Sequence, residues 1–128
     1  MPAVKMVIVC RKDLKCRKGK MMAQAAHAAV NAILNLGILD ASTCTITIPM
    51  DSIYEWFNGL STKICVGVNS EEELLLTAND AKAKGLPVAV VEDAGITEFH
   101  GVPTLTCIAI GPSKSELIDQ ITGHLELL

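Results

Sequence analysis

Residues 4–37 read VKMVIVCRKDLKCRKGKMMAQAAHAAVNAILNLG, and this stretch sets the order of the first elements of the fold. It begins with a continuous apolar run, Val4–Cys10, that is rich in Val and Ile and is typical of a strand buried on both faces. A basic loop follows, and Lys20–Leu36 then predicts a helix that ends at Gly37. A buried strand, a loop and a helix in this order indicate an α/β fold.

The rest of the chain continues this alternation of strands and helices. Thr43–Ile48 alternates strictly, as an edge strand with one solvent-facing side does, and Pro49 opens a short helix that Gly59 closes. The sequence predicts a three-layer α/β/α sandwich with a small mixed sheet. Its remaining elements are strands at Thr62–Val68, Pro87–Val91 and Thr104–Ile110, a helix from a capping box at Ser70 and Glu73 to Gly85, and a last helix from a capping box at Ser113 and Glu116 to Gly123.

Length and composition fit one domain over residues 1–128. A chain of 128 residues is near the usual size of a single domain, and half of its residues are apolar and can form a core. The apolar residues are almost all aliphatic, so a platform of aromatic rings for stacking single-stranded bases is not expected. The only tryptophan, Trp56, is expected to pack in the core beside Ile53 and Phe57. No apolar stretch approaches the roughly 20 residues of a membrane span, and the N-terminus lacks a secretion signal, so a cytoplasmic protein is expected.

The five cysteines are odd in number, and four lie within strand-like runs, which favours reduced, mostly buried thiols over a disulfide framework. Cys16 lies among basic residues that favour its thiolate, and a nucleophilic Cys16 with His27 as its base is an alternative to an ordinary loop cysteine. The histidines have no ligand-like spacing, and nucleotide-binding motifs are absent. The sequence therefore predicts neither a metal nor a cofactor.

The charge of the chain is unevenly distributed. Residues 1–20 carry seven Lys or Arg against one Asp, whereas residues 21–128 carry four against thirteen acidic residues, which gives the net charge of −3. Such an asymmetry attracts a polyanion to one rim of an acidic body. A solvated basic loop is the alternative, but its position between a strand and a helix favours binding of an RNA backbone. The five loop cations are Arg11, Lys12, Lys15, Arg17 and Lys18.

The first helix carries a stripe of polar side chains. Its members are spaced four, three and four residues apart, so they fall on one helix face surrounded by alanines. An ordinary exposed polar face is the alternative, although such faces usually carry Glu and Lys pairs that are missing here. The members of the stripe are Lys20, Gln24, His27 and Asn31.

A second polar cluster follows a strand, at Asp93-Ala94-Gly95-Ile96-Thr97. The end of a strand is where α/β folds gather their functional groups, and both Glu92 and Asp93 are candidates by this criterion. Gly95 would allow a turn with positive φ, and Thr97 supplies a hydroxyl near the same end of the strand. An ordinary Asp-x-Gly turn is the alternative interpretation.

Three clusters together resemble the type 2 peptidyl-tRNA hydrolase family: residues 11–27, residues 93–97 and Thr122-Gly123-His124. The resemblance extends from Lys5 to Leu128. It selects Asp93 over Glu92. The chain departs from the family pattern at Ile96 and Glu98, where the family often has Arg and then Gln, and at Thr43–Ile48, where the family passes more directly to the second helix.

The resemblance implies a hydrolase that cleaves the ester between a peptide, or an N-blocked amino acid, and the 3′-terminal ribose of tRNA. Asp93 would orient or deprotonate the attacking water with Thr97 in its network, and Lys20 would stabilise the oxyanion or a phosphate. Gln24 and His27 would position the acyl group and the ribose. The basic loop would hold the acceptor arm without reading bases, through Arg11, Lys12, Lys15, Arg17 and Lys18.

Several points stay open at the level of sequence. An unperturbed aspartate is a weak base at neutral pH, so Asp93 needs either a raised pKa or a purely orienting role. A related aminoacyl-tRNA deacylase is one alternative function, motivated by Ile96 and Glu98. A non-catalytic RNA-binding or protein-binding relative is the other. The chain could also act as a homodimer.

Overall fold

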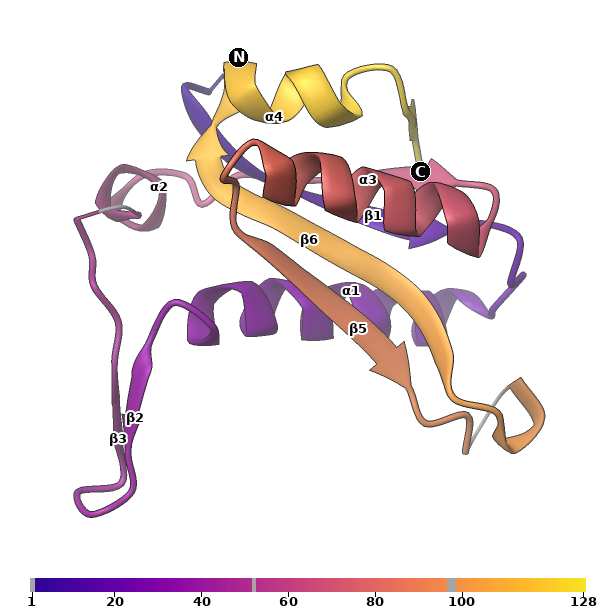
Figure 1. Cartoon of the computed structure of the whole chain (residues 1–128), viewed down its shortest axis with the longest axis horizontal. Coiled ribbons are helices and arrows are strands. Elements are labelled where there is room, and N and C mark those ends of the chain that lie inside the picture. Colours follow the sequence, from indigo (N-terminus) through magenta and orange to yellow (C-terminus); the bar gives the residue numbers. More distant parts are fainter. Residues whose placement is uncertain (1, 52, 97–98) are drawn as a thin grey trace.

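The computed structural model describes residues 2–51, 53–96 and 99–128, and it has a central sheet with helices on both faces (Figure 1). The main sheet has five strands in the order β5-β6-β1-β4-β7, and a separate sheet pairs β2 with β3. The elements are β1 (Val4–Arg11), α1 (Lys18–Leu34), β2 (Ile38–Asp40), β3 (Thr45–Thr47), α2 (Tyr54–Asn58), β4 (Lys63–Val68), α3 (Glu71–Ala83), β5 (Val88–Asp93), the short turn η1 (Phe99–Gly101), β6 (Thr104–Lys114), α4 (Ser115–Thr122) and β7 (Glu126–Leu127).

The central strand β1 supplies both halves of the core. Val7 and Val9 face the layer of α3 and α4, whereas Met6 and Ile8 face the layer of α1 and α2. All four side chains are almost fully buried, as the continuous apolar run of this strand predicts. The predicted three-layer α/β/α sandwich is confirmed.

The strand directions bring several functional segments to one edge of the sheet. β1 runs parallel to β4 and antiparallel to β6, and β5 is antiparallel to β6. The carboxyl ends of β1, β4 and β5 therefore lie on the same side. The basic loop after β1, the start of α1 and the end of β5 meet there.

The two predicted capping boxes have different outcomes. Ser70 caps α3, since its hydroxyl accepts a hydrogen bond from the Glu73 amide at 3.1 Å, and the Glu73 carboxylate accepts from the Asn69 amide at 2.8 Å. The capping box at Ser113 and Glu116 is wrong. β6 extends to Lys114 because Ser113 pairs with Lys5 of β1, and α4 begins only at Ser115 without a side-chain cap.

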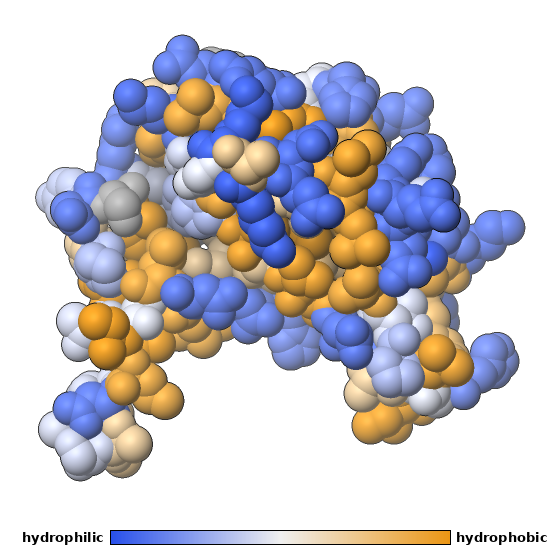
Figure 2. All heavy atoms as spheres, in the orientation of Figure 1, coloured by the Kyte–Doolittle hydropathy of each residue, from blue (hydrophilic) through white to orange (hydrophobic). Residues whose placement is uncertain are grey.

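The edge strand predicted at Thr43–Ile48 is confirmed in part, since it is shorter than predicted and lies outside the main sheet. β3 covers only Thr45–Thr47 and pairs with β2, which the sequence analysis missed, in a hairpin that projects from the body (Figure 1). The hairpin turn is local, because the Asp40 carboxylate accepts hydrogen bonds from the amide and hydroxyl of Ser42. Hydrophobic side chains remain exposed on this projection (Figure 2). On the β4 side, β7 occupies the edge of the main sheet.

The short helix α2 begins at Tyr54, later than Pro49 predicts, and is followed by Gly59 as expected. Trp56 is buried, and its indole N–H donates to the Thr62 carbonyl at 2.9 Å, which confirms its packing role. Phe57 is 58% exposed, so its predicted place in the core is wrong. Among the described residues, no helix combines the length and apolar character needed to cross a bilayer.

Candidate active site

A lysine and an aspartate from distant parts of the chain meet where α1 begins and β5 ends. Lys20 lies in the first turn of α1, and Asp93 is the last residue of β5. The Lys20 amine donates to Asp93 Oδ1 at 2.7 Å, and the Gln24 amide donates to the same oxygen at 2.9 Å. Both charged side chains are largely buried, with exposed fractions of 17% for Lys20 and 12% for Asp93. Three of the predicted catalytic residues therefore form one cluster.

The turn after β5 fixes the other oxygen of the carboxylate. Asp93 Oδ2 accepts a hydrogen bond from the Gly95 amide at 2.8 Å. Gly95 has φ +82°, and the Val102 backbone lies where a Cβ atom would be, so a glycine is required there for two reasons. The positive φ predicted for Gly95 is confirmed. Thr97 and Glu98 lie outside the described residues.

The surroundings of Asp93 keep it ionised. The pKa of this carboxyl lies below its usual value, mainly because of the hydrogen bond from Lys20. The hydrogen bonds from the Gly95 amide and Gln24 lower this pKa further, whereas partial desolvation raises it. A carboxylate with a lowered pKa is a poor proton acceptor, but it is a strong hydrogen-bond acceptor. The geometry therefore favours an orienting role for Asp93 over that of a general base.

Gln24 is buried, and it is held by a residue that the sequence analysis missed. The Thr106 hydroxyl donates to Gln24 Oε1 at 3.2 Å, and the Asp93 carboxylate, which can only accept, requires the Gln24 amide nitrogen on its side. Thr106 lies at a β-bulge. Val91 of β5 pairs with Cys107 and Glu92 pairs with Leu105, so no residue of β5 pairs with Thr106. Bulges commonly re-aim side chains beside active sites. The available signal was a threonine directly before the apolar run Cys107–Ile110.

A cleft of about 350 Å³ opens from this cluster along α1. Gln24, His27 and Asn31 line one side, and residues 90–94 of β5 and its following turn line the other. Three members of the predicted polar stripe thus face one cavity. His27 is exposed in the cleft, and Asn31 is half-buried at its far end.

The start of α1 concentrates positive charge. Arg17 is the N-cap residue, Lys18 and Lys20 follow in the first turn, and that turn contains no acidic residue. Cations at a helix N-terminus oppose the helix dipole, and the Asp93 carboxylate offsets this unfavourable interaction for Lys20. A Cβ atom on Gly19 would meet no atom within 4 Å, so packing does not explain this glycine.

The five predicted RNA-binding residues differ in their surroundings. The Arg11 guanidinium forms a two-pronged pair with Asp13 and donates to the Leu105 carbonyl at 3.0 Å, so it fixes the loop to β6. Lys12 pairs with Glu126 at 3.1 Å. The exposed cations of the loop are Lys15, Arg17 and Lys18.

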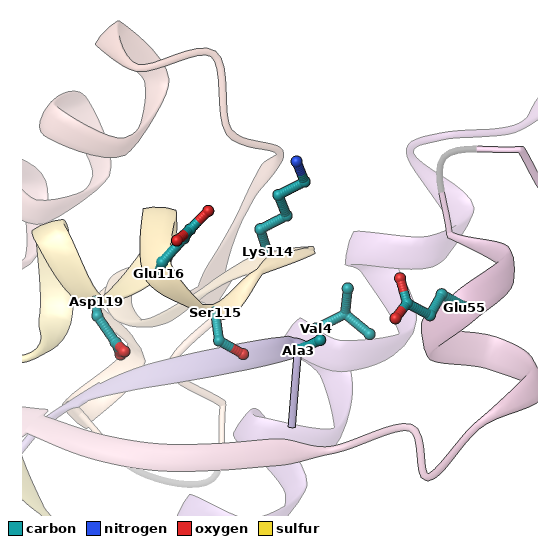
Figure 3. Close-up of a pocket in the computed structure, with 7 residues that line it drawn as sticks. All are labelled: Ala3, Val4, Glu55, Lys114, Ser115, Glu116 and Asp119. Carbon is teal, nitrogen blue, oxygen red and sulfur yellow. The ribbon is translucent and has the colours of Figure 1, made fainter. Parts of the chain in front are cut away.

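A larger cleft of about 450 Å³ lies at the opposite end of β1. Figure 3 shows Glu55 of α2 on one side and Lys114 with the start of α4 on the other. Its acidic residues, Glu55, Glu116 and Asp119, make it unsuited to an RNA substrate. No group of three or more His, Cys, Asp or Glu side chains that could hold a metal occurs within the described part of the chain.

Known proteins resemble this chain over almost its whole length. The sequence profile of the family described as peptidyl-tRNA hydrolase PTH2 matches residues 4–128. A peptidyl-tRNA hydrolase of Methanocaldococcus jannaschii is 43% identical over 125 residues, which cover 98% of this chain and 100% of that protein. Peptidyl-tRNA hydrolases of Saccharolobus islandicus and Saccharolobus solfataricus are 42% and 41% identical, each covering 98% of this chain and 99% of the relative.

One solved structure supports the fold alone. A protein of unknown function from Agrobacterium tumefaciens superimposes with a TM-score of 0.57 at 13% identity, covering 100% of this chain and 99% of the other.

Proposed function

This chain belongs to the peptidyl-tRNA hydrolase PTH2 family, and we infer from this that it hydrolyses the ester between a peptide and the 3′-terminal ribose of tRNA. We propose that the chemistry takes place at Lys20 and Asp93. The observation that supports this best is their contact at the mouth of a cleft, across 73 positions of the chain. A cation held by a carboxylate in a partly buried site is suited to stabilising a developing negative charge.

Ester hydrolysis passes through a tetrahedral intermediate whose former carbonyl oxygen is negatively charged. Lys20 is the donor for this oxygen in our proposal, and the N-terminus of α1 adds to the positive potential. Asp93 holds Lys20 in place by the 2.7 Å hydrogen bond. It also accepts a hydrogen bond from the attacking water, which aligns the water with the ester carbon. The proton that this water loses passes through solvent in the cleft to the ribose oxygen that leaves, so the products are the free peptide acid and the tRNA hydroxyl. Thr97 belongs to the same proposed network.

The other cleft residues divide between substrate contact and support. Gln24 is nearly inaccessible, and its amide is used by Asp93 and Thr106, so we assign it to positioning Asp93. His27 is exposed in the cleft, and we assign it to contacts with the ribose or the acyl group.

We propose that the exposed cations of the basic loop, Lys15, Arg17 and Lys18, contact phosphates of the acceptor arm without reading its bases. Arg11 fixes the shape of this loop through Asp13 and Leu105. The loop lies directly before α1, so the tRNA approaches the ester from the N-terminal end of that helix. We propose that residues 1–128 act as one domain and that the protein works in the cytoplasm, where its tRNA substrate arises.

The test is release of labelled amino acid from N-acetyl-aminoacyl-tRNA by the purified protein, with unblocked aminoacyl-tRNA as the control. The blocked substrate should be hydrolysed and the unblocked one spared. Equal hydrolysis of both would identify an aminoacyl-tRNA deacylase instead. No hydrolysis of either would leave a binding protein of the same fold.

A further inference from the structure

The strand that ends in Asp93 lies at the edge of the main sheet. β5 pairs with β6 on one side, and among the described residues no strand pairs with its other side. An unpaired strand edge presents a row of backbone donors and acceptors that can pair with another extended chain. Such an edge is usually shielded when it has no partner to bind.

The backbone groups that face this free edge can be identified. The Gly111 amide of β6 donates to the Pro87 carbonyl at 2.9 Å, so the backbone of Pro87 faces β6, and by alternation along the strand so does that of Val91. Backbone groups of successive residues in a strand point to opposite sides, so those of Val90 and Glu92 face the open edge. Val90 is 38% exposed and Glu92 is exposed, whereas Val91 is buried.

This edge is continuous with the candidate active site. The cleft that contains Gln24 and Asp93 is also lined by Val90 and Val91 of β5 and by Asn31 of α1. It therefore leads away from Asp93 toward the C-terminal part of α1. The basic loop lies at the other end of that helix, so the tRNA and the peptide of one substrate would leave the ester in different directions.

We propose that the peptide of the substrate adds as an extra strand to the free edge of β5. This rests on the proposed function, and it assigns the acyl side of the same site. The esterified residue is the C-terminal residue of the peptide, and it lies at Asp93, the C-terminal residue of β5. The peptide strand therefore runs parallel to β5. At about 3.3 Å per residue in both strands, the six residues Val88–Asp93 pair with roughly six residues of peptide.

Main-chain pairing fits the chemistry of this substrate. A stalled peptide has no fixed sequence, so side-chain pockets would reject many substrates, whereas backbone hydrogen bonds accept nearly all of them. Unblocked aminoacyl-tRNA has no peptide bond to pair, so the same edge would favour peptidyl-tRNA over it. Alternate side chains of the peptide would lie over His27 and Asn31 on the α1 side.

The first experiment changes only the substrate. KM is measured for a series from N-acetyl-aminoacyl-tRNA to tRNA carrying an N-acetylated peptide of eight residues. KM should fall as the peptide lengthens to about six residues and then stay level. A single N-methyl group on the peptide should raise KM about fivefold when it replaces an N–H that faces β5. The same group on the next residue should have little effect, because the N–H of that residue points away from β5.

The second experiment changes the strand. Val90→Pro removes an N–H that faces the free edge and none that pairs with β6, and its folding is checked by circular dichroism. The ratio of kcat/KM between the longest and shortest substrates should fall to near one in this variant. The N-methyl series on the unaltered protein keeps the proposal testable if Val90→Pro does not fold.

The outcomes separate this proposal from the proposed function. If N-acetyl-aminoacyl-tRNA is not hydrolysed, the proposed function itself fails. If it is hydrolysed but KM depends on neither peptide length nor N-methylation, the edge of β5 does not bind the peptide and the function stands. If Val90→Pro dissociates a dimer in sedimentation and leaves the length series unchanged, a second copy of the chain occupies the edge and the proposal is overturned.

Discussion

The Lys20 amine lies 2.7 Å from the Asp93 carboxylate, at the junction of the first turn of α1 with the end of β5. The two groups are only 17% and 12% exposed, so water screens their interaction less than that of a surface pair. Neither residue is needed to fill the core. We therefore interpret the Asp93 carboxylate as the group that holds the Lys20 cation beside the cleft.

Asp93→Asn should lower kcat by about 100-fold or more, with little change in melting temperature. Asparagine keeps the size of the side chain and can still accept the Gly95 amide, but it cannot hold Lys20 by charge. Single-turnover hydrolysis of N-acetyl-aminoacyl-tRNA measures the effect. Asp80→Asn, an exposed carboxylate of α3, is the matched control and should behave as the unaltered protein. Near-normal turnover in Asp93→Asn would remove Asp93 from the mechanism.

Gln24→Leu should lower kcat by roughly tenfold while KM changes little, because Gln24 acts by positioning Asp93. Thr106→Val should have a smaller effect in the same direction, since its hydroxyl orients Gln24. The double variant should be no slower than Gln24→Leu alone, because Thr106 acts through Gln24. Additive losses in kcat would show that the two side chains work independently.

The pH dependence of kcat should show no acid limb from Asp93 between about pH 5 and pH 8. Lys20 holds the pKa of this carboxyl below its usual value near 4, so the anion persists throughout that range. A kcat limb centred near pH 6 that disappears in Asp93→Asn would instead indicate a general base with a raised pKa.

The same lowered pKa links stability to pH. The stabilisation by the Asp93 anion is present above the pKa of the unfolded state, near 4, and is lost as pH falls through the lower pKa of the folded state. In urea denaturation, the free energy of unfolding of the unaltered protein should therefore exceed that of Asp93→Asn by a small and constant amount from pH 7 to about pH 5. The difference should shrink below about pH 4.

Local signals predicted much of the fold and the site. The apolar run of β1, the capping residue Ser70 and the turn glycine Gly95 each act within a few residues, and each was identified correctly. The helical spacing of Lys20 and Gln24 also placed both side chains at the cluster with Asp93.

Features that depend on distant pairing were not predictable in this way. Ser113 has the local pattern of a helix cap, but its pairing with Lys5 keeps it in β6. Thr106 becomes important only because a bulge aims it at Gln24, 82 residues away. The sequence alone suggests that Arg11 is an exposed cation, because its hydrogen bond to the Leu105 carbonyl forms only in the folded chain.

Trp56 provides a spectroscopic test of the core between the main sheet and the layer of α1 and α2. Its ring is 5% exposed, and its N–H is bonded to the Thr62 carbonyl, so its fluorescence should be blue-shifted and resistant to acrylamide. Addition of tRNA should leave the emission unchanged, because the ring packs in the core. Strong quenching by tRNA would show that the RNA reaches α2.

The basic loop is tested by the dependence of tRNA binding on salt. Lys15→Ala combined with Lys18→Ala should raise KM and leave kcat at saturation nearly intact, because phosphate contacts bind the substrate uniformly. Each lost contact should flatten the plot of log affinity against log salt concentration by about 0.7 to 0.9. The matched control is Lys82→Ala with Lys84→Ala, which removes the same charge from exposed positions at the end of α3, on the other face of the sheet. An equal change of slope in both double variants would show that only net charge matters. An unchanged slope in the loop variant would mean that the RNA docks elsewhere.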